Sequence, residues 1–549
     1  MKAMTGRQSG YASPWGQRLL LVAMVMSCIN MPCADSKNIL VVDSMFAMSH
    51  YQTLSLIGGE LAGKGHNVTV LIGECMLTHV DTTRHRDILH FEIYDCGITA
   101  EERTAIKTIF GKLSLTGELS SFTWYAKMWL GLLPYDPEIS AFRKHIFDNK
   151  ASDKRYAELK DIKERLIAMN FDLVVCDTFT PWCAVYAHDM LSLPYVNVVS
   201  STFLGTRYTR WANSPSPLSY VPEFMTHYTD SMPFLQRVKN FLMHCLSLLI
   251  YDYISLKNLD VIRDTWGNRS SLSNREIMAG ASLYVVNQDF LFEYPRPLQP
   301  NIVLCGGVST REAQPLSQEL EAFMQGSGDE GVLVFSFSTL VNHMDDKMAD
   351  MIAGALARLP FRVIWKYMVE RQPATLGNNT LLSKWIPQND LLGHNQTKLF
   401  VYHGGANGAY EAIYHGVPLV GIPLFADQLD NMIRLRSRGM AEHFGGILEV
   451  TTDTLYEKIM KVATNPSYKK NAERTSAIYR SPPLRPLERA AFWIEHVMTH
   501  GHEHLQSNRG NMTWVQLNLL DIAGALIAVC LVLAFSLRWW CTSISKELS

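Results

Sequence analysis

Short apolar runs that alternate with helix-like sequence constrain the fold of this chain more than any other feature. In the first half these runs occupy residues 38–42, 68–72, 172–176 and 195–199, and a helix-like stretch at 51–63 separates the first two. Continuous apolar runs of this length are typical of buried strands. Strands separated by helices pair in parallel, with helices on both faces of the sheet. The pattern predicts an α/β protein with doubly wound parallel sheets.

The same pattern restarts after a segment marked by prolines. Three prolines punctuate residues 295–300, and further strand-like runs follow at 332–337, 362–365, 398–402 and 418–422. The economical interpretation is two doubly wound halves, at 35–300 and 301–500, although one large sheet would give the same local pattern. In the two-half arrangement the strand ends of each half would line a shared cleft.

The N-terminus has the order of charged and apolar residues that is typical of a secretory signal peptide. An apolar run at 19–29 follows Lys2, Arg7 and Arg18, precedes Ala34, and is too short to span a bilayer. We therefore expect residues 1–34 to be a signal peptide. The alternative is a buried strand or helix of the fold.

A second apolar segment, near the C-terminus, has the length of a membrane-spanning helix. Residues 519–537 contain one charged side chain, Asp521, and tryptophans flank them at interfacial heights (Trp514, Trp539, Trp540). Such a segment accounts for part of the apolar excess in a chain that is 47% hydrophobic and 19% charged. We predict a type I membrane protein with a spanning helix at 517–538 and a cytoplasmic tail at 539–549. A buried C-terminal helix is the alternative.

The charge balance argues against a nucleic-acid-binding protein, and the cysteine spacing argues against a disulfide scaffold or a cysteine metal site. The chain has 50 Lys and Arg against 52 Asp and Glu, and it lacks a dense basic stretch, so no nucleic-acid partner is expected. Six cysteines between the two apolar ends show neither CxxC pairs nor metal-ligand spacing, which favours isolated thiols over a disulfide framework. These are Cys75, Cys96, Cys176, Cys183, Cys245 and Cys305.

Secretory entry would expose acceptor sequons for N-glycosylation. They lie at Asn67, Asn268, Asn378, Asn395 and Asn511.

The apolar run 241–256 is interrupted by His244 and Asp252, which favours a buried helix over a spanning one. A membrane-facing patch that admits lipophilic acceptors is the alternative for this run.

The densest group of chemically useful residues follows Phe400, in the segment FVYHGGANGAYEAIYHGVPLVGIPLFADQLDN. The segment predicts a strand, a glycine-rich turn, a helix, a strand and a second turn. Glycines let the backbone approach a ligand closely, and the free N–H groups at a helix start favour an anion. Polar residues from two strand ends join the turn: His403, Asn407, Glu411, Asp427 and Gln428.

This segment is similar to the signature of the UDP-glycosyltransferases, specifically of the membrane-anchored animal UDP-glucuronosyltransferase group. The resemblance covers nearly the whole chain, including WIPQ at 385–388, residues 485–498 and the terminal anchor. It implies a GT-B fold, in which an N-terminal Rossmann-like domain binds the acceptor and a C-terminal one binds the UDP-sugar across a cleft. The segment at 376–394 also resembles the ceramide galactosyltransferase branch, so the donor sugar stays open.

The resemblance implies roles for the residues that would hold the nucleoside and the sugar. Trp385 would stack on uracil, Gln388 would hydrogen-bond the ribose or base, and Glu411 would accept from the ribose hydroxyls. Asp427 and Gln428 would bind the sugar hydroxyls. An aromatic face suits a planar base, and a carboxylate suits paired hydroxyls.

The diphosphate would meet a second group of residues. By the same resemblance His403, Asn407 and Gly408 would contact the diphosphate. So would the hydroxyl of Thr339, in the loop after the strand at 332–337. The chain contains no Asp-x-Asp triplet, so we expect no metal, and we expect UDP-glucuronate as a co-substrate with no further cofactor. The helix dipole and His403 would stabilise the departing UDP.

On the acceptor side, His50 matches the catalytic histidine of the family and Asp177 matches the aspartate that orients it. An acceptor hydroxyl must lose its proton as it attacks the anomeric carbon, and a histidine held by a carboxylate suits that task. Attack opposite the leaving UDP inverts the anomeric configuration.

Three features of the sequence depart from the family pattern. Ser338 and Thr339 stand where relatives usually carry Gly-Ser, and Tyr402 replaces a Ser or Thr before His403. The tail has only Lys546, whereas dilysine retrieval signals use two lysines. Residence in the endoplasmic reticulum membrane is therefore expected from the resemblance.

The sequence leaves three functions open. The first is an inverting UDP-glucuronosyltransferase that acts on small lipophilic hydroxyl compounds. The second keeps the mechanism with a glucose or galactose donor and lipid or small-molecule acceptors. The third is a catalytically quiet UDP-sugar-binding relative. A homo-oligomer is compatible with all three.

Overall fold

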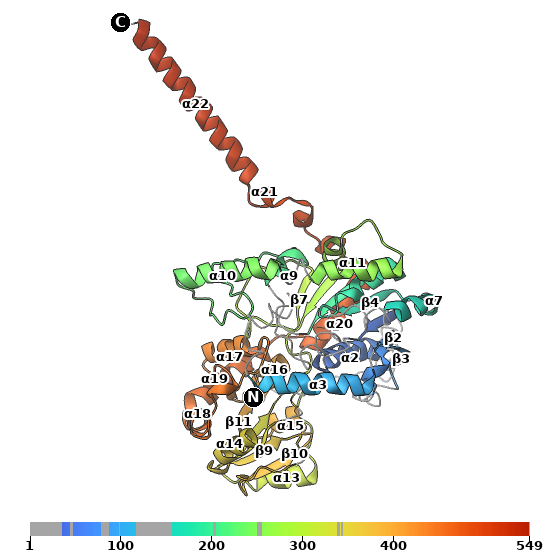
Figure 1. The fold of residues 1–549 in the computed structure, drawn as a ribbon, viewed down its shortest axis with the longest axis vertical. Coiled ribbons are helices and arrows are strands. Elements are labelled where there is room, and N and C mark those ends of the chain that lie inside the picture. The colour runs from blue at the N-terminus through green and yellow to red at the C-terminus, as the bar shows by residue number, and fades with distance from the viewer. Residues whose placement is uncertain are drawn as a thin grey trace, which may run out of the picture.

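The computed structural model describes residues 36–43, 48–77, 87–97, 99–116, 156–200, 205–249, 255–337, 341, 344–369 and 371–547. The expected signal peptide at 1–34 and the loop residues Ser338 and Thr339 lie outside these ranges. Two parallel sheets form two halves of the body, and a long helix leaves the body at the C-terminus (Figure 1).

The first sheet has the order β3-β2-β1-β4-β5-β6-β7, and every neighbouring pair is parallel. Strands β4 and β5 are buried at every residue, as the continuous apolar runs require. The seven strands are β1 (Asn38–Val42), β2 (Asn67–Gly73), β3 (His90–Tyr94), β4 (Leu173–Asp177), β5 (Tyr195–Val199), β6 (Leu283–Val286) and β7 (Ile302–Leu304).

Helices cover this first sheet and extend beyond it. They are α2 (Met48–Gly63), α3 (Ala100–Leu115), α7 (Lys163–Ala168), α8 (Trp182–Val185), α9 (Gly205–Arg210), α10 (Phe234–Ser247), α11 (Ser255–Trp266) and α12 (Asn274–Ala279). Helix α3 begins at a capping box, in which the Thr99 side chain accepts from the N–H of Glu102 and the Glu102 side chain accepts from the N–H of Thr99.

The second sheet has the order β10-β9-β8-β11-β12-β13, again with every pair parallel. Its strands are β8 (Val332–Ser336), β9 (Arg362–Lys366), β10 (Thr380–Ser383), β11 (Thr397–Tyr402), β12 (Leu419–Gly421) and β13 (Ala441–His443). The order reverses between β8 and β11 here, and between β1 and β4 in the first sheet. Ligands of open parallel sheets bind at such switch points.

The helices that surround the second sheet are α13 (Gln318–Gln325), α14 (Asp346–Ala357), α15 (Gln388–Leu392), α16 (Ala406–His415), α17 (Gln428–Ser437), α18 (Thr452–Thr464) and α19 (Pro466–Tyr479). Helix α16 ends at Gly416, whose φ of 64° lies in the left-handed region that favours glycine. The predicted α/β class with two doubly wound halves agrees with this architecture, and the eight predicted strands match observed ones to within one or two residues.

Near its C-terminus the chain returns to the first half. The predicted division at residues 300 and 500 did not anticipate this return. Strand β7 pairs with β6 in the first sheet, beyond the expected boundary at residue 300. Helix α20 (Pro486–His500) buries Ala490, Ala491 and Ile494 in the core of the first half. On its surface Glu495 binds Lys64 at 2.9 Å and His66 at 3.1 Å. Residues 486–500 therefore pack with the first half.

Two disulfide bonds correct the expectation of isolated thiols. Cys75 pairs with Cys96, and Cys176 pairs with Cys183. Cys75 and Cys96 follow the neighbouring strands β2 and β3, whereas Cys176 lies in β4 and Cys183 in the helix α8 that follows it. The spacing of cysteines in the sequence does not reveal that these pairs are close in space. Cys245 and Cys305 are free thiols, as expected.

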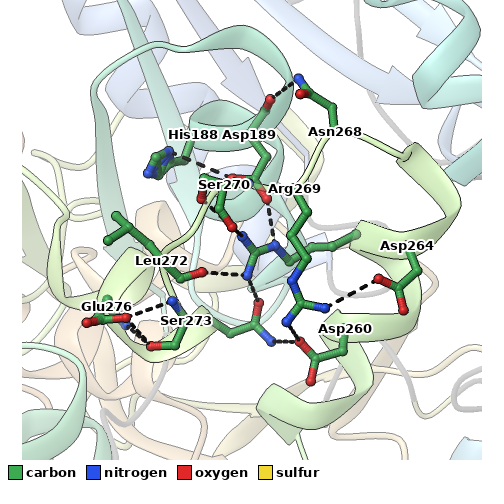
Figure 2. A network of polar contacts seen from close by, with 12 residues as sticks. His188, Asp189, Asp260, Asp264, Asn268, Arg269, Ser270, Leu272, Ser273 and Glu276 are labelled. Atoms are coloured by element: carbon green, nitrogen blue, oxygen red, sulfur yellow. Dashed lines mark hydrogen bonds and ion pairs between the residues drawn. The ribbon is translucent and has the colours of Figure 1, made fainter.

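A buried charge network ties the helices of the first half together (Figure 2). The fully buried side chain of Arg263 donates from Nε to Asp189 at 2.6 Å and from its other nitrogens to Leu272, Asn274 and Ser270. Because each guanidinium nitrogen has a partner, the charge is tolerated in the core. The Asn268 amide of one sequon joins this network by donating to the Asp189 carbonyl at 2.6 Å.

Helix α10 departs from the expectation of a buried helix in the run 241–256. Its polar residues Asn240 and His244 face inward, while four large apolar side chains are more than half exposed. These are Phe234, Leu235, Phe241 and Leu242. In Figure 1 α10 extends from the end of the body at which the C-terminal helix leaves.

The C-terminal segment contains a short helix, α21 (Trp514–Leu517), and a long one, α22 (Leu520–Glu547). Of the described residues, only those at Leu520–Ser545 form a helix long and apolar enough to span a membrane, and none of that stretch is buried. Helix α22 begins three residues after the predicted start at 517, because α21 ends at Leu517 and Leu519 interrupts the helix with a φ of 54°. The helix also continues through the expected tail at 539–547.

Candidate active site

His50 and Asp177 meet at the switch point of the first sheet. Asp177 ends β4, and His50 lies in the first turn of α2, which follows β1. The distance between His50 Nδ1 and Asp177 Oδ2 is 2.6 Å, and both side chains are buried. The other carboxylate oxygen of Asp177 accepts from the N–H of Phe179 at 2.9 Å. The aspartate is thus held on one side by the backbone and holds the imidazole on the other.

The surroundings of His50 suit a proton acceptor. Burial lowers the pKa of His50, but the Asp177 carboxylate and its hydrogen bond, with smaller contributions from Asp427 and Asp43, raise it above its ordinary value overall. Within the described part of the chain Nε2 has no hydrogen-bond partner. The ring of Phe179, which is half exposed, lies edge-on to the imidazole with 5.2 Å between centroids. Nε2 is therefore the atom that can accept a proton.

The influence of Asp427 on His50 shows that the two halves face each other. Asp427 precedes α17 in the second half, whereas His50 belongs to the first. An aromatic contact joins the same regions: Phe110 of α3 meets Phe425 edge to face, with 4.9 Å between centroids. The predicted catalytic pair of the first half therefore lies near the predicted sugar-binding pair of the second half.

The glycine-rich turn lies at the switch point of the second sheet. Strand β11 ends at Tyr402, and α16 begins after Gly405, whose position provides no side-chain cap. Gly404 has a φ of 91°, and a side chain there would meet the Gln428 carbonyl oxygen at 2.7 Å. The N–H groups at the start of α16 have no side-chain cap, and such groups at the positive end of a helix dipole can hold an anion.

His403 is a neutral donor at this turn. Burial lowers the pKa of His403 to about 4. A hydrogen bond with the Ser336 backbone opposes this decrease, and the positive charge of Lys366 adds to it. Its Nδ1 is buried and has no hydrogen-bond partner among the described residues. A neutral imidazole can donate one hydrogen bond to a phosphate oxygen without carrying charge, and Lys366 at the end of β9 supplies the cation nearby.

Asn407 is positioned by a residue that the sequence patterns did not reveal. Asn287, directly after β6, donates from Nδ2 to Asn407 Oδ1 at 3.3 Å. Its Oδ1 accepts from the N–H groups of Gly307 and Val308. Asn287 belongs to the first half, so this contact also links the halves beside the proposed diphosphate site.

Gln388 and Glu411 form a pair next to the turn. Gln388 Nε2 donates to Glu411 Oε2 at 2.6 Å. Burial raises the pKa of Glu411 to about 7, although the Gln388 hydrogen bond opposes that rise. Trp385, three residues earlier, is 72% exposed, so its ring is available to stack on a planar base.

The pair Asp427 and Gln428 is fixed by its own loop and helix. Gln428 Oε1 accepts from the N–H groups of Leu424 and Phe425. Asn431 donates to Asp427 Oδ2 at 3.1 Å and to the Gly404 carbonyl at 3.0 Å. Asn431 thus joins the glycine turn to residues 424–428, which are called the sugar loop below after their predicted role.

Tyr402 is fully buried against Phe400, with 4.7 Å between ring centroids, and its ring lies beneath Gly408. The core of the second half thus accommodates the side chain that departs from the family pattern. Thr339, the remaining predicted site residue, lies outside the described residues. In the part of the chain that the structure describes, no group of three or more His, Cys, Asp or Glu side chains is arranged to hold a metal ion.

Comparison with known proteins identifies the family. The profile described as "UDP-glucoronosyl and UDP-glucosyl transferase" matches residues 37–548. The chain belongs to this UDP-glycosyltransferase family. It is 35% identical over 497 residues to UDP-glucuronosyltransferase 2C1 of Oryctolagus cuniculus, covering 90% of this chain and 95% of that relative. It is 36% identical over 502 residues to UDP-glucuronosyltransferase 2B7 of Homo sapiens, covering 90% of each.

The GT-B fold is confirmed by a solved structure as well. The glycotransferase of kitacinnamycin aligns with a TM-score of 0.54 at 16% identity, covering 84% of this chain and 98% of that one. The predicted GT-B fold, family and enzyme class are therefore confirmed. This UDP-glycosyltransferase transfers a glycosyl group from a UDP-sugar to an acceptor.

A clamp between the halves adjoins the sugar loop of this UDP-glycosyltransferase. Asp430, in the first turn of α17, accepts from the backbone N–H of Met225 at 2.7 Å and of His227 at 3.1 Å, and it meets His227 Nδ1 at 2.9 Å. Met225 and His227 have φ values of 60° and 59°, which cost non-glycine residues about 1–3 kcal/mol each. The buried carboxylate compensates for that strain.

We predict that His50→Ala lowers kcat by about 10²–10⁴-fold while UDP-sugar binding is retained, because only proton transfer is lost. Wild-type kcat should rise with pH through the raised pKa of His50, since the neutral imidazole is the base. In Asp177→Asn that limb should move to lower pH and kcat should fall. Kinetics from pH 5 to 9 and calorimetry check this. Glu223→Gln, which alters the similar pair between His244 of α10 and Glu223, is the control; equal effects of Asp177→Asn and Glu223→Gln would contradict the assignment.

For the clamp we expect Asp430→Asn to lower kcat roughly tenfold, because an amide replaces one charged acceptor oxygen with a donor and loses a charge-assisted hydrogen bond. The KM for the UDP-sugar should change less than about twofold, since the sugar loop keeps its own bonds. Asp453→Asn, which removes an exposed ion pair with Arg358, should leave kcat unchanged. Matching values for the two variants would show that Asp430 does not align the halves.

Proposed function

We propose that this enzyme transfers glucuronate from UDP-glucuronate, with inversion, to a hydroxyl of a small lipophilic acceptor. The observation that carries the proposal is the His50–Asp177 pair, in which the carboxylate holds Nδ1 at 2.6 Å and Nε2 has no hydrogen-bond partner among the described residues. The names of the similar proteins, UDP-glucuronosyltransferases 2C1 and 2B7, support glucuronate as the sugar.

The proposed reaction uses one base and one leaving-group site. The acceptor oxygen attacks the anomeric carbon while its proton passes to His50 Nε2, and Asp177 stabilises the imidazolium that forms. The bond from the anomeric carbon to the diphosphate oxygen breaks with its electron pair, and UDP leaves. The α16 N-terminus, neutral His403 and Lys366 would stabilise the charge on the diphosphate.

The nucleoside half of UDP would occupy the site beside the turn. Trp385 would stack on uracil, while Glu411, held by Gln388, would accept from the ribose hydroxyls. Asp427 and Gln428 would bind the sugar hydroxyls, with Asn407, Gly408 and Thr339 at the diphosphate. A UDP-hexose donor is the second candidate, because neutral hydroxyls would satisfy the same sugar loop.

A donor-by-acceptor activity matrix tests the proposal. UDP-glucuronate, UDP-glucose and UDP-galactose are each supplied with a panel of phenols and aliphatic alcohols, and products are identified by mass. We expect glucuronides to form fastest, by about tenfold or more, and His50→Ala to abolish them. Preferred transfer of a hexose would replace the donor assignment, and binding of UDP-sugars without any transfer would favour a quiet binding protein.

We further propose that the protein is a type I protein of the endoplasmic reticulum membrane, with its catalytic body in the lumen. Helix α22 provides the anchor, and two disulfides agree with an oxidising compartment. The exposed apolar face of α10, on the same end of the body as α22 in Figure 1, supports the alternative that the run 241–256 faces the membrane.

A truncation after residue 517 tests this second contact. Without α22 we expect the body still to sediment with lipid vesicles, because burying the α10 side chains gains about 25 cal/mol per Å² of apolar surface. The double substitution Phe241→Asp and Leu242→Asp should release it. Leu448→Asp, at an even more exposed apolar residue of the second half, is the control. A truncated body that stays in solution would contradict the α10 contact.

A further inference from the structure

Arg103 occupies an unusual position on helix α3. Arg103, Ile106, Phe110 and Ser114 repeat at helical spacing and form one stripe, in which Arg103, Ile106 and Ser114 are buried. The side chain of Arg103 is 4% exposed, so its guanidinium lies inside the protein with the apolar members of the stripe.

The guanidinium is not satisfied by the protein. Its Nε and Nη1 are buried and have no hydrogen-bond partner among the described residues. It also lies in the first turn of α3, where the helix dipole disfavours a cation. An unpaired charge in this place lowers stability. Arg263 differs from Arg103, because each of its guanidinium nitrogens has a hydrogen-bond partner.

The position of α3 places Arg103 at the cleft. Two turns along the same stripe, Phe110 contacts Phe425, which lies two residues before Asp427 of the sugar loop. At the other side Asp43, which follows β1, influences both Arg103 and the catalytic His50. Arg103 is thus a cation that flanks the reaction site and retains unused donors.

We propose that Arg103 binds a carboxylate of the bound substrates. A guanidinium offers two parallel N–H donors to a carboxylate, and either such pair would neutralise the charge and include one of the two orphaned nitrogens. The inference rests on the proposed function, because glucuronate carries a carboxylate where glucose and galactose carry a neutral hydroxymethyl group. A carboxylate on the acceptor has the same chemistry, and separate measurements distinguish the two sources.

The test uses Arg103→Met in the full-length enzyme, which keeps the volume and removes the charge. In the donor arm, kcat/KM is measured with a neutral phenol and either UDP-glucuronate or UDP-glucose. In the acceptor arm, UDP-glucose is paired with phenol or with a hydroxybenzoate. Lys112→Met, near the end of the same helix, is the matched control. Calorimetric binding of both UDP-sugars is measured in parallel, because binding does not depend on turnover.

We expect Arg103→Met to lower kcat/KM for one carboxylate-bearing substrate by about 100-fold, and for its neutral counterpart by less than about threefold. The arm in which the loss appears identifies the source of the carboxylate. Equal losses for charged and neutral substrates, or no loss in either arm, would overturn the proposal. If the wild type binds UDP-glucuronate through Arg103 but transfers nothing, the proposed function fails and the carboxylate site stands.

The melting temperature separates this role from a structural one. Removing an unpaired buried charge should leave the melting temperature of Arg103→Met equal to or above that of the wild type. A large decrease, with equal loss of activity toward all substrates, would show that Arg103 serves as the counter-ion of Asp43. That outcome also overturns the proposal.

Discussion

Parallel pairing of every strand in both sheets is the constraint on which the rest of the molecule depends. Because all strands of a sheet run the same way, their carboxyl ends meet at one edge, and polar residues that end strands gather there. Asp43, Asp177 and His50 gather at the first switch point, and His403 with the glycine turn gathers at the second. The position of the active site is therefore a consequence of the strand topology. It brings together residues that lie far apart in the sequence.

Burial then gives each polar group its chemical character. The same exclusion of water that lowers the pKa of His403 to about 4 raises that of Glu411 to about 7, since each loses its charged form. His50 differs because a carboxylate 2.6 Å away outweighs its desolvation. The site thus contains a base that can take up a proton, beside an imidazole that stays neutral.

The sequence patterns predicted what depends on local order. Buried runs such as those of β1 and β5 were located with their exact residues, and the glycine turn was found because its residues are contiguous. Edge strands β3 and β10 are partly exposed, and β7 and β13 have three residues each, so their apolar signal was weak. Asn287, Lys366 and Asp430 were missed because their roles arise only when distant strands and the two halves come together. The Cys176–Cys183 pairing was missed because spacing alone does not specify geometry.

The return of α20 to the first half has a consequence for how this fold can be divided. A chimera that joins the first 300 residues of one relative to the remainder of another would bring a foreign helix against α2, β6 and β7. Helix α20, which covers the first half, would be inherited with the second half. Recombination and domain exchange in such chains are therefore limited by the fit of Ala490, Ala491 and Ile494 into a core encoded several hundred residues earlier.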